Sequence, residues 1–331
     1  MIKRALEFYT RTFAIWIVCF AVVAFYYPKP FVFLGRIKIL ELVTENFAYT
    51  LSGNMLFFAL TMFGIGVALN PADFKQILKK PWIVAIGSAA QFTIMPLGAY
   101  LLAKAFNLSP IVTVGLILTG AAPGAMASNV MSYVAKADAA YSVSLTTVST
   151  LLCPLLTPLL TGILAGSTLP IPMVKMFVDV LIMVLIPLLF GFLIRRLFGP
   201  FIEKILPVFP ALSVTFIIFV CSVVIALNRK RLPQLTGVIL ATGVILNLYG
   251  TAMGYGVGHV CRMTIPRRRA LAIEIGMQNA GLGSVLALEN FGEEAALPAA
   301  LFVFICIITA SILAGYWQRC DATCGIKKLS T

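Results

Sequence analysis

The segment EIGMQNAGLG, from Glu274 to Gly283, combines one carboxylate, two carboxamides and three glycines within a strongly apolar part of the chain. Glu274 is the only acidic residue well inside a long hydrophobic stretch, since Asp179 lies near the start of its own. A carboxylate inside a membrane is costly unless a cation, a proton or a partner charge neutralises it. Because no Lys or Arg falls in the middle of a predicted helix, the sequence indicates a bound cation or a proton.

Composition indicates that this carboxylate lies in a membrane. The 331 residues are 60% hydrophobic and 11% charged, with a mean hydropathy of +1.00, which is far too apolar for a soluble domain of this length. Long uncharged runs, such as residues 82–103 and 205–228, are sufficient to cross a hydrocarbon core. We therefore predict an all-α polytopic membrane protein. Cutting the sequence at turn residues and charge clusters gives ten transmembrane helices, at residues 12–27, 51–70, 82–104, 110–135, 139–165, 172–194, 206–228, 234–260, 268–290 and 295–318.

Basic residues predict the orientation of these helices. An even number of helices puts both termini on one side, and 17 of the 25 Lys and Arg residues lie on that side. Cytoplasmic loops collect positive charge, so we expect both termini in the cytoplasm and the protein in the inner (plasma) membrane, surrounded by the lipid bilayer. The net charge of +13 is then explained by topology, and nucleic acid is not an expected partner because the charges are scattered in short loops. A cleaved signal peptide at residues 12–27 is disfavoured because no small-residue cleavage site follows.

A second unusual segment, GAAPGAMASN, interrupts the fourth helix with Pro123, so the fourth and ninth helices are both broken near their middles. If the chain is divided after residue 168, each break falls in the fourth helix of a five-helix half. An odd number of helices makes the two halves cross the membrane in opposite senses, and discontinuous helices at matching positions of such inverted repeats mark the binding sites of transporters. We therefore predict two inverted repeats, at residues 1–168 and 169–318, and a cytoplasmic tail at 319–331.

Glycine-rich stretches in membrane helices also serve close packing. Gly250, Gly254 and Gly258, spaced by four in the eighth helix, fit that role. For the fourth and ninth helices we favour a binding site instead, because the two breaks occupy equivalent positions and Glu274 lies beside one of them.

The helix breaks and nearby hydroxyl groups together predict a cation site. An unwound stretch frees backbone carbonyls, which suit a hard cation, and bare N–H groups, which suit an anion. In the fifth helix, Ser142 and Thr146 share one face. Such hydroxyls often bond only to the preceding turn, but here Ser128, Asn129 and Glu274 are possible neighbours. Hydroxyl, amide and carboxylate oxygens without imidazole or thiolate describe a hard-cation site, for which sodium is the abundant candidate.

Four motifs carry a family resemblance, namely APGAMASNVMSYVAKADAAYSVSLTTVSTLLCPLLTP, LAIEIGMQNAGLG, MFGIGVALNPADF and AQFTIMP. They resemble the bile acid:sodium symporter family, especially its bacterial members, and the resemblance spans residues 12–318. It implies ten helices in two inverted repeats, with a panel domain of helices 1, 2, 6 and 7 and a core domain of the other six. It also implies that the broken fourth and ninth helices cross each other.

The resemblance further implies two sodium ions and a substrate site. The first ion would be bound by Ser128, Asn129, Ser142, Thr146 and Glu274. The second would be bound by Gln91, Gln278 and Glu274 together with the backbone carbonyls of Ile275 and Met277. The substrate would face Asn279, Gly124, Met126 and Ala127 at the crossing, and Cys306 and Ile307 in the tenth helix.

The substrate positions depart from the family pattern. Cys306 and Ile307 stand where bacterial relatives carry a His-Asn pair, and Met126 stands where they carry Thr. Polar contacts to a bile acid are thereby lost. A smaller organic anion, such as pantothenate or a keto acid, fits at least as well as a bile-acid-like substrate.

The predicted function is therefore import of an organic anion by a sodium-coupled symporter that works by alternating access. A proton-coupled organic anion transporter and a cation/proton antiporter of the same fold are alternatives, although an antiporter is expected to show paired acidic residues where this chain has only Glu274. A channel would be distinguished by the absence of saturable, substrate-dependent sodium uptake. An enzyme is not expected, because the chain has no HExxH or GxSxG motif and His259 is its only histidine.

Overall fold

The computed structural model describes residues 6, 8–10, 12–44, 47–69, 81–206 and 208–329. The last two residues of the predicted tail lie outside this part of the chain. Several basic residues that were used to predict the topology also lie outside it. The NPADF end of the motif MFGIGVALNPADF lies outside it as well. These basic residues are Lys3, Arg4, Arg11, Lys75, Lys79 and Lys80.

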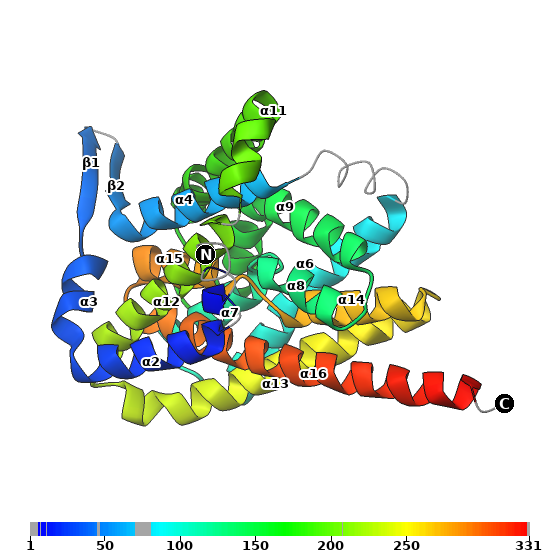
Figure 1. The fold of residues 1–331 in the computed structure, drawn as a ribbon. Coiled ribbons are helices and arrows are strands. Elements are labelled where there is room, and N and C mark those ends of the chain that lie inside the picture. The colour runs from blue at the N-terminus through cyan, green and yellow to red at the C-terminus, as the bar shows by residue number, and fades with distance from the viewer. Residues whose placement is uncertain are drawn as a thin grey trace.

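Helices occupy each of the ten ranges predicted from the sequence (Figure 1). Six of the described helices are long and apolar enough to cross a membrane, or seven if the bent pair α2 and α3 forms one span. The halves of the two broken helices have 9 to 12 residues each and are too short to do so alone. The chain is therefore an α-helical polytopic membrane protein. Its helices are α2 (Phe13–Tyr26), α3 (Pro28–Gly35), α4 (Gly53–Ala68), α6 (Pro81–Ala105), α7 (Pro110–Ala121), α8 (Met126–Val134), α9 (Ala139–Ala165), α10 (Met173–Val180), η1 (Leu181–Leu185), α11 (Ile186–Ile205), α12 (Val208–Asn228), α13 (Leu232–Val260), α14 (Ile265–Gly276), α15 (Ala280–Phe291), η2 (Glu294–Ala296) and α16 (Leu297–Leu329).

A two-stranded antiparallel hairpin follows α3 and is an exception to the all-α prediction. It consists of β1 (Lys38–Thr44) and β2 (Phe47–Ser52). β1 contains the β-branched residues Ile39, Val43 and Thr44, and β2 contains Phe47, Tyr49 and Thr50; both residue classes suit an extended backbone. The hairpin and α3 lie at one end of the helix bundle, opposite the C-terminus (Figure 1). We call this end the hairpin end.

Local signals explain where several helices begin. Side chains cap α4, α7, α9 and α15, where Ser52, Ser109, Asp138 and Asn279 each accept a hydrogen bond from the backbone N–H group three residues further along. These caps position the first turn of each helix. A π-helical turn, η1, between α10 and α11 was not predicted from the sequence.

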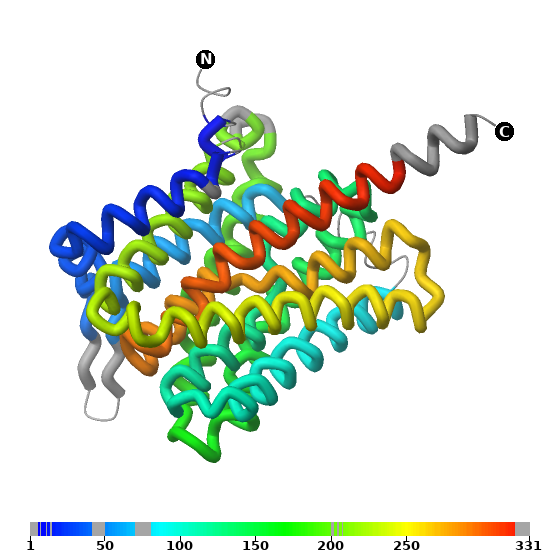
Figure 2. The backbone as a smooth tube through the Cα atoms, turned by 90° about the horizontal axis from the view of Figure 1, so that it is seen from below, coloured from blue at the N-terminus to red at the C-terminus, as the bar shows by residue number. Residues whose placement is uncertain are grey.

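The helices form two groups that pack mainly among themselves, although α10, which continues through η1 into α11 of the first group, also packs on α9 of the second. The first group contains α2, α3, α4, α10, α11 and α12, and the second contains α6, α7, α8, α9, α13, α14, α15 and α16. Within the second group, α13 runs beside α14 and α16 (Figure 2). Gly254 allows α13 to approach α14, because a Cβ there would lie 2.8 Å from Leu271 O and 3.1 Å from Ala272 Cα. The packing role predicted for this glycine is confirmed.

Candidate functional site

The two helix breaks lie side by side and are joined by backbone hydrogen bonds. Ala125 N donates to Met277 O at 2.9 Å, and Asn279 N donates to Pro123 O at 2.8 Å. Between these bonds, Gly124 and Gln278 form an antiparallel bridge. Each break therefore supplies hydrogen-bond partners for the other, which the unwound backbone needs in an environment without water.

Side chains from neighbouring helices satisfy carbonyls that the breaks set free. Thr157 Oγ1 in α9 donates to Ala121 O at 2.7 Å, and Asn247 Nδ2 in α13 donates to Gly276 O at 2.8 Å. Both side chains are buried. Neither residue was predicted from the sequence to belong to the site. A carboxamide in the middle of an apolar helix was the available signal for Asn247, whereas Thr157 has no distinguishing pattern.

The Glu274 carboxylate lies at the end of α14 and is only 2% exposed. Its Oε2 accepts hydrogen bonds from Ser128 Oγ at 2.5 Å and Ser142 Oγ at 2.8 Å, and its Oε1 accepts one from Thr146 Oγ1 at 2.5 Å. These groups come from α8 and α9. The structure thus brings together residues of three helices around one carboxylate, and all the groups that hydrogen-bond to it are neutral.

Asn129 completes this cluster, because its Oδ1 lies 2.9 Å from Ser142 Oγ and 3.2 Å from Thr146 Oγ1. The Ser128 hydroxyl also faces Ala125 O at 2.6 Å, and the Thr146 hydroxyl faces Ser142 O at 3.1 Å. Three hydroxyl protons therefore face five acceptor oxygens, although each hydroxyl can donate only one hydrogen bond. An oxygen-rich cluster that is short of protons suits a hard cation. In the described residues, no group of three His, Cys, Asp or Glu side chains could hold a metal ion.

The residues predicted for a second cation also lie together. Gln91 Nε2 donates to Gln278 Oε1 at 2.7 Å, and Gln278 Nε2 donates to Ile275 O at 2.8 Å. Gln91 Oε1 is buried and has no hydrogen-bond partner. The Met277 carbonyl already accepts the bond from Ala125 N. The carboxylate and amide oxygens of the cluster around Glu274 all accept hydrogen bonds, so Gln91 Oε1 differs from them in being unpaired. Ile275 and Met277 follow Glu274 closely along the chain.

The predicted substrate residues fall into two sets. Gly124, Met126, Ala127 and Asn279 lie at the crossing, where Asn279 Oδ1 accepts from Leu282 N at 3.1 Å and caps α15. Cys306 and Ile307 lie in α16, and within the described part of the chain the Cys306 thiol makes no hydrogen bond to the crossing. Cys306 Sγ is buried and faces Val303 O of its own helix at 3.3 Å.

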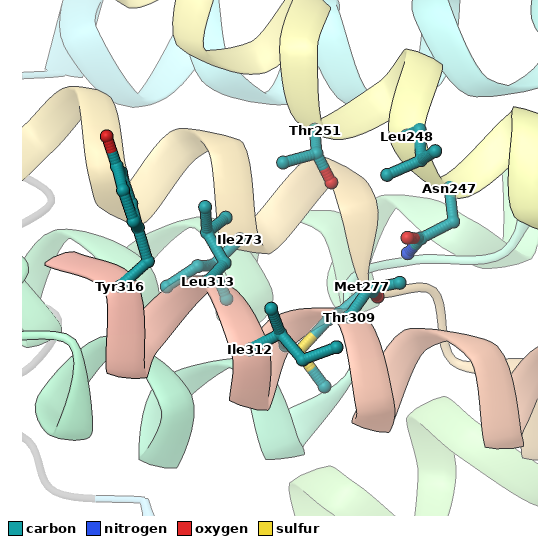
Figure 3. Close-up of a pocket in the computed structure, with 10 residues that line it drawn as sticks. Asn247, Leu248, Thr251, Ile273, Met277, Thr309, Ile312, Leu313 and Tyr316 are labelled. Carbon is teal, nitrogen blue, oxygen red and sulfur yellow. The ribbon is translucent and has the colours of Figure 1, made fainter.

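A mainly apolar cavity of about 340 Å³ lies between α13, α14 and α16 (Figure 3). Asn247 and Thr251 line it from α13, Met277 from the second break, and Thr309 and Tyr316 from α16. No Lys or Arg lines this cavity, and Met277 is the one predicted site residue in its wall. The cavity is therefore separate from the positions predicted for the substrate.

Comparison with known proteins gives consistent matches. The chain matches the family model described as Sodium Bile acid symporter family over residues 55–235. It is 38% identical over 323 residues to the sodium-dependent transporter YocS of Bacillus subtilis, which covers 96% of this chain and 94% of that protein. It is 31% identical over 261 residues to the probable sodium/metabolite cotransporter BASS1 of Arabidopsis thaliana chloroplasts, covering 78% of this chain and 65% of that protein. It is 28% identical over 243 residues to the human ileal sodium/bile acid cotransporter, covering 71% and 69% respectively. Each of these relatives is a transporter by name, which confirms the prediction of a transporter rather than an enzyme.

The hydrogen bond from Thr157 to the first break predicts a measurable contribution to stability. Thr157→Val keeps the side-chain shape but leaves Ala121 O without this donor, which should cost about 1–3 kcal/mol. Thr161→Val is a matched control, because Thr161 is equally buried and donates to Thr157 O within the same helix. Thermal unfolding of the purified protein should show a clearly larger loss for Thr157→Val. Equal losses would mean that the bond does not support the break.

Proposed function

Because the chain belongs to the sodium bile acid symporter family, we propose that it is a sodium-coupled symporter that imports a small organic anion. The observation that carries this proposal is the buried carboxylate of Glu274, which neutral hydroxyls surround and which no positive side chain contacts among the described residues. A buried charge needs an opposite charge nearby. A sodium ion bound beside Glu274 supplies that positive charge and can dissociate again from the same site.

The first sodium ion binds Glu274 with the oxygens of Ser128, Asn129, Ser142 and Thr146. The shortage of protons in this cluster supports the assignment, because a cation takes lone pairs that hydrogen bonds leave unused. When the ion binds, the hydroxyl protons can turn toward Ala125 O and Ser142 O, which they already face. Binding thus exchanges one set of hydrogen-bond partners for another within the cluster.

The second sodium ion binds beside the first, at Gln91, Gln278, Glu274 and the carbonyls of Ile275 and Met277. The unpaired, buried oxygen of Gln91 supports this site. Because Glu274 would serve both ions, the second ion adds a positive charge that the protein does not balance. The anionic substrate can supply the remaining negative charge.

The organic anion binds at the crossing, near the first residues of α8 and α15. Both half-helices begin there, and the N-terminal ends of helices favour negative charge. Gly124, Met126, Ala127 and Asn279 are the residues nearest this position, with Cys306 and Ile307 from α16 as further candidates. Since these side chains offer few polar contacts, a small anion such as pantothenate or a keto acid is favoured over a bile-acid-like molecule.

The proposed architecture is ten membrane spans in two inverted repeats, residues 1–168 and 169–318, with both termini and the tail at 319–331 in the cytoplasm and the chain in the inner (plasma) membrane. The first and second helix groups correspond to the panel and core domains of the family. Transport proceeds by alternating access, as the second group moves against the first and exposes the crossing to each side in turn. The distribution of Lys and Arg supports the orientation.

Replacing the charge of Glu274 tests the sodium site directly. We expect sodium, but not potassium, to raise the unfolding temperature of the purified wild-type protein, because a ligand at 100 times its Kd stabilises the state it binds by about 2.7 kcal/mol. Glu274→Gln keeps the size of the side chain and should lose this sodium effect. Glu203→Gln, which removes an exposed carboxylate from α11, should keep it. A sodium effect of equal size in both variants would exclude Glu274 as a ligand, and stabilisation by low pH in place of sodium would favour the proton-coupled alternative.

Two adjacent threonines of α9 provide a matched test of the hydroxyl ligands. Thr146 Oγ1 faces Glu274 and Asn129, whereas Thr147 Oγ1 donates to Val143 O at 2.8 Å, and both residues are buried. Thr146→Val should weaken sodium binding at least tenfold, which corresponds to about 1.4 kcal/mol. High sodium should restore its uptake by mass action, and Thr147→Val should change sodium affinity less than twofold. If both variants respond alike, Thr146 has a structural role.

The number of sodium ions predicts a response to membrane potential. Two sodium ions entering with one monovalent anion, such as pantothenate, carry one net positive charge inward, and that charge gains about 2.3 kcal/mol per 100 mV. An inside-negative potential should therefore accelerate uptake into proteoliposomes, with potassium and valinomycin setting the potential. If uptake of a monovalent substrate does not depend on the membrane potential, or if the sodium-to-substrate ratio is one, the two-ion proposal is contradicted.

A further inference from the structure

Polar residues connect the two helix groups at the hairpin end, and three of them, Ser52, Asn54 and Asp179, are buried. The first group contributes Ser52 and Asn54 at the start of α4 and Lys175 and Asp179 from α10. The second group contributes Glu289 and Asn290 from the last turn of α15. We call these six residues the polar latch.

Glu289 joins the latch to α4. Its Oε1 accepts a hydrogen bond from Ser52 Oγ at 2.5 Å and lies 3.4 Å from Asn54 Nδ2. Ser52 Oγ also caps α4, where it accepts from Met55 N at 3.2 Å. The contact with α15 is therefore made by the residue that begins α4, and a movement of α15 acts directly on this helix end.

Asn290 joins the latch to α10. Its Nδ2 donates to Asp179 Oδ2 at 2.9 Å, and its Oδ1 accepts from Lys175 Nζ at 2.9 Å. Lys175 also lies 3.3 Å from both Asp179 Oδ2 and Glu289 O. Asp179 is 1% exposed. One amide side chain thus links the lysine and the aspartate of the opposite helix group.

The same end holds further contacts between the groups. Asn228 Nδ2, at the end of α12, donates to Glu293 O at 2.7 Å. Arg36, which follows α3, forms an exposed ion pair with the Glu293 carboxylate at 3.0 Å. At the opposite end, the ion pairs that Arg267 forms with Asp138 and Arg269 forms with Asp321 stay within the second group. The described polar contacts therefore fasten the two groups together mainly at the hairpin end.

Two latch oxygens, and one oxygen of the neighbouring Asn228, have no partner. Asn54 Oδ1, Asp179 Oδ1 and Asn228 Oδ1 are buried without a hydrogen bond. Unpaired buried polar atoms offset part of the stabilisation that the paired ones provide. If the two groups separate at this end, water can hydrate all of these atoms. The paired atoms therefore stabilise the closed arrangement, whereas the unpaired atoms lower the free-energy cost of opening the latch.

We propose that the polar latch closes the hairpin end of the transport path and must open once in each transport cycle. This inference rests on the alternating access of the proposed function. The coupling element is α15, whose first residue lies at the crossing and whose last turn carries Glu289 and Asn290. Its 12 residues span about 18 Å as one helix. A shift of the crossing when ions and anion bind is thus transmitted to the latch.

Spin labels test the latch without reference to transport. The labels would be placed on cysteines at Phe33 in α3 and Leu101 in α6, both exposed and outside the latch, in a chain whose seven native cysteines are replaced. Asn290→Ala removes the link between α10 and α15 and should increase the population with a long distance between the labels at least threefold. Glu294→Ala is the matched control, because Glu294 contacts Ser109 within the second group at the same end. Identical distance distributions in the two variants would overturn the proposal.

Reversible cross-linking tests whether the latch has to open. Ser52 and Glu289 are replaced by cysteines, which a short, cleavable, thiol-reactive cross-linker joins. The cross-link should reduce uptake of radioactive sodium in the presence of pantothenate at least tenfold. Cleavage of the linker should restore this uptake. Cysteines at Ser109 and Glu294, joined in the same way, should leave uptake unchanged. Full uptake by the first cross-linked pair would refute the latch. If neither pair transports sodium before cross-linking, the symporter proposal fails, and the spin-label distances still decide whether the latch holds the helix groups together.

Discussion

Two backbone hydrogen bonds, from Ala125 N to Met277 O and from Asn279 N to Pro123 O, hold the centre of this molecule together. A membrane helix can be broken only where its freed polar groups find new partners. Here each break supplies partners for the other, and Thr157 and Asn247 supply partners for neighbouring carbonyls. The ends of four half-helices are thereby fixed at one point inside the bundle, and the rest of the second helix group packs around that point.

The pairing of the breaks also determines the surroundings of Glu274. Because α14 ends at the crossing, its last turn lies against α8 and α9, and the carboxylate meets hydroxyls from both. Gly124 leaves space for it, since a Cβ at this position would collide with Glu274 Oε1. The result is a buried negative charge with neutral neighbours. Such a charge is unfavourable in a bare protein and becomes favourable when a mobile cation joins it, so the site is suited to bind an ion and to release it.

Half-helices connect the crossing to the ends of the bundle. α15 runs from its N-cap Asn279 at the crossing to Glu289 and Asn290 at the hairpin end, where the two helix groups share partly buried polar contacts. Within the second group, glycines of α13 allow close contact with α14, so these helices can move as a unit. The interface between the groups combines apolar packing with a few polar bonds that water can replace. Movement at this interface is what the proposed alternating access requires.

The sequence by itself determined that the chain is a helical membrane protein, where its helices lie and where two of them break. Apolar runs impose helices in a bilayer, and Pro123 and the glycines near Gly276 weaken a helix locally wherever it packs. The helical period likewise placed Ser142 and Thr146 on one face, and the family resemblance linked them to Glu274. The hairpin was missed because short alternating strands are weak signals beside long apolar helices. The tertiary structure alone decided the roles of Thr157, Asn247 and the latch residues, because each of these side chains gains its partner only when packing brings distant segments together.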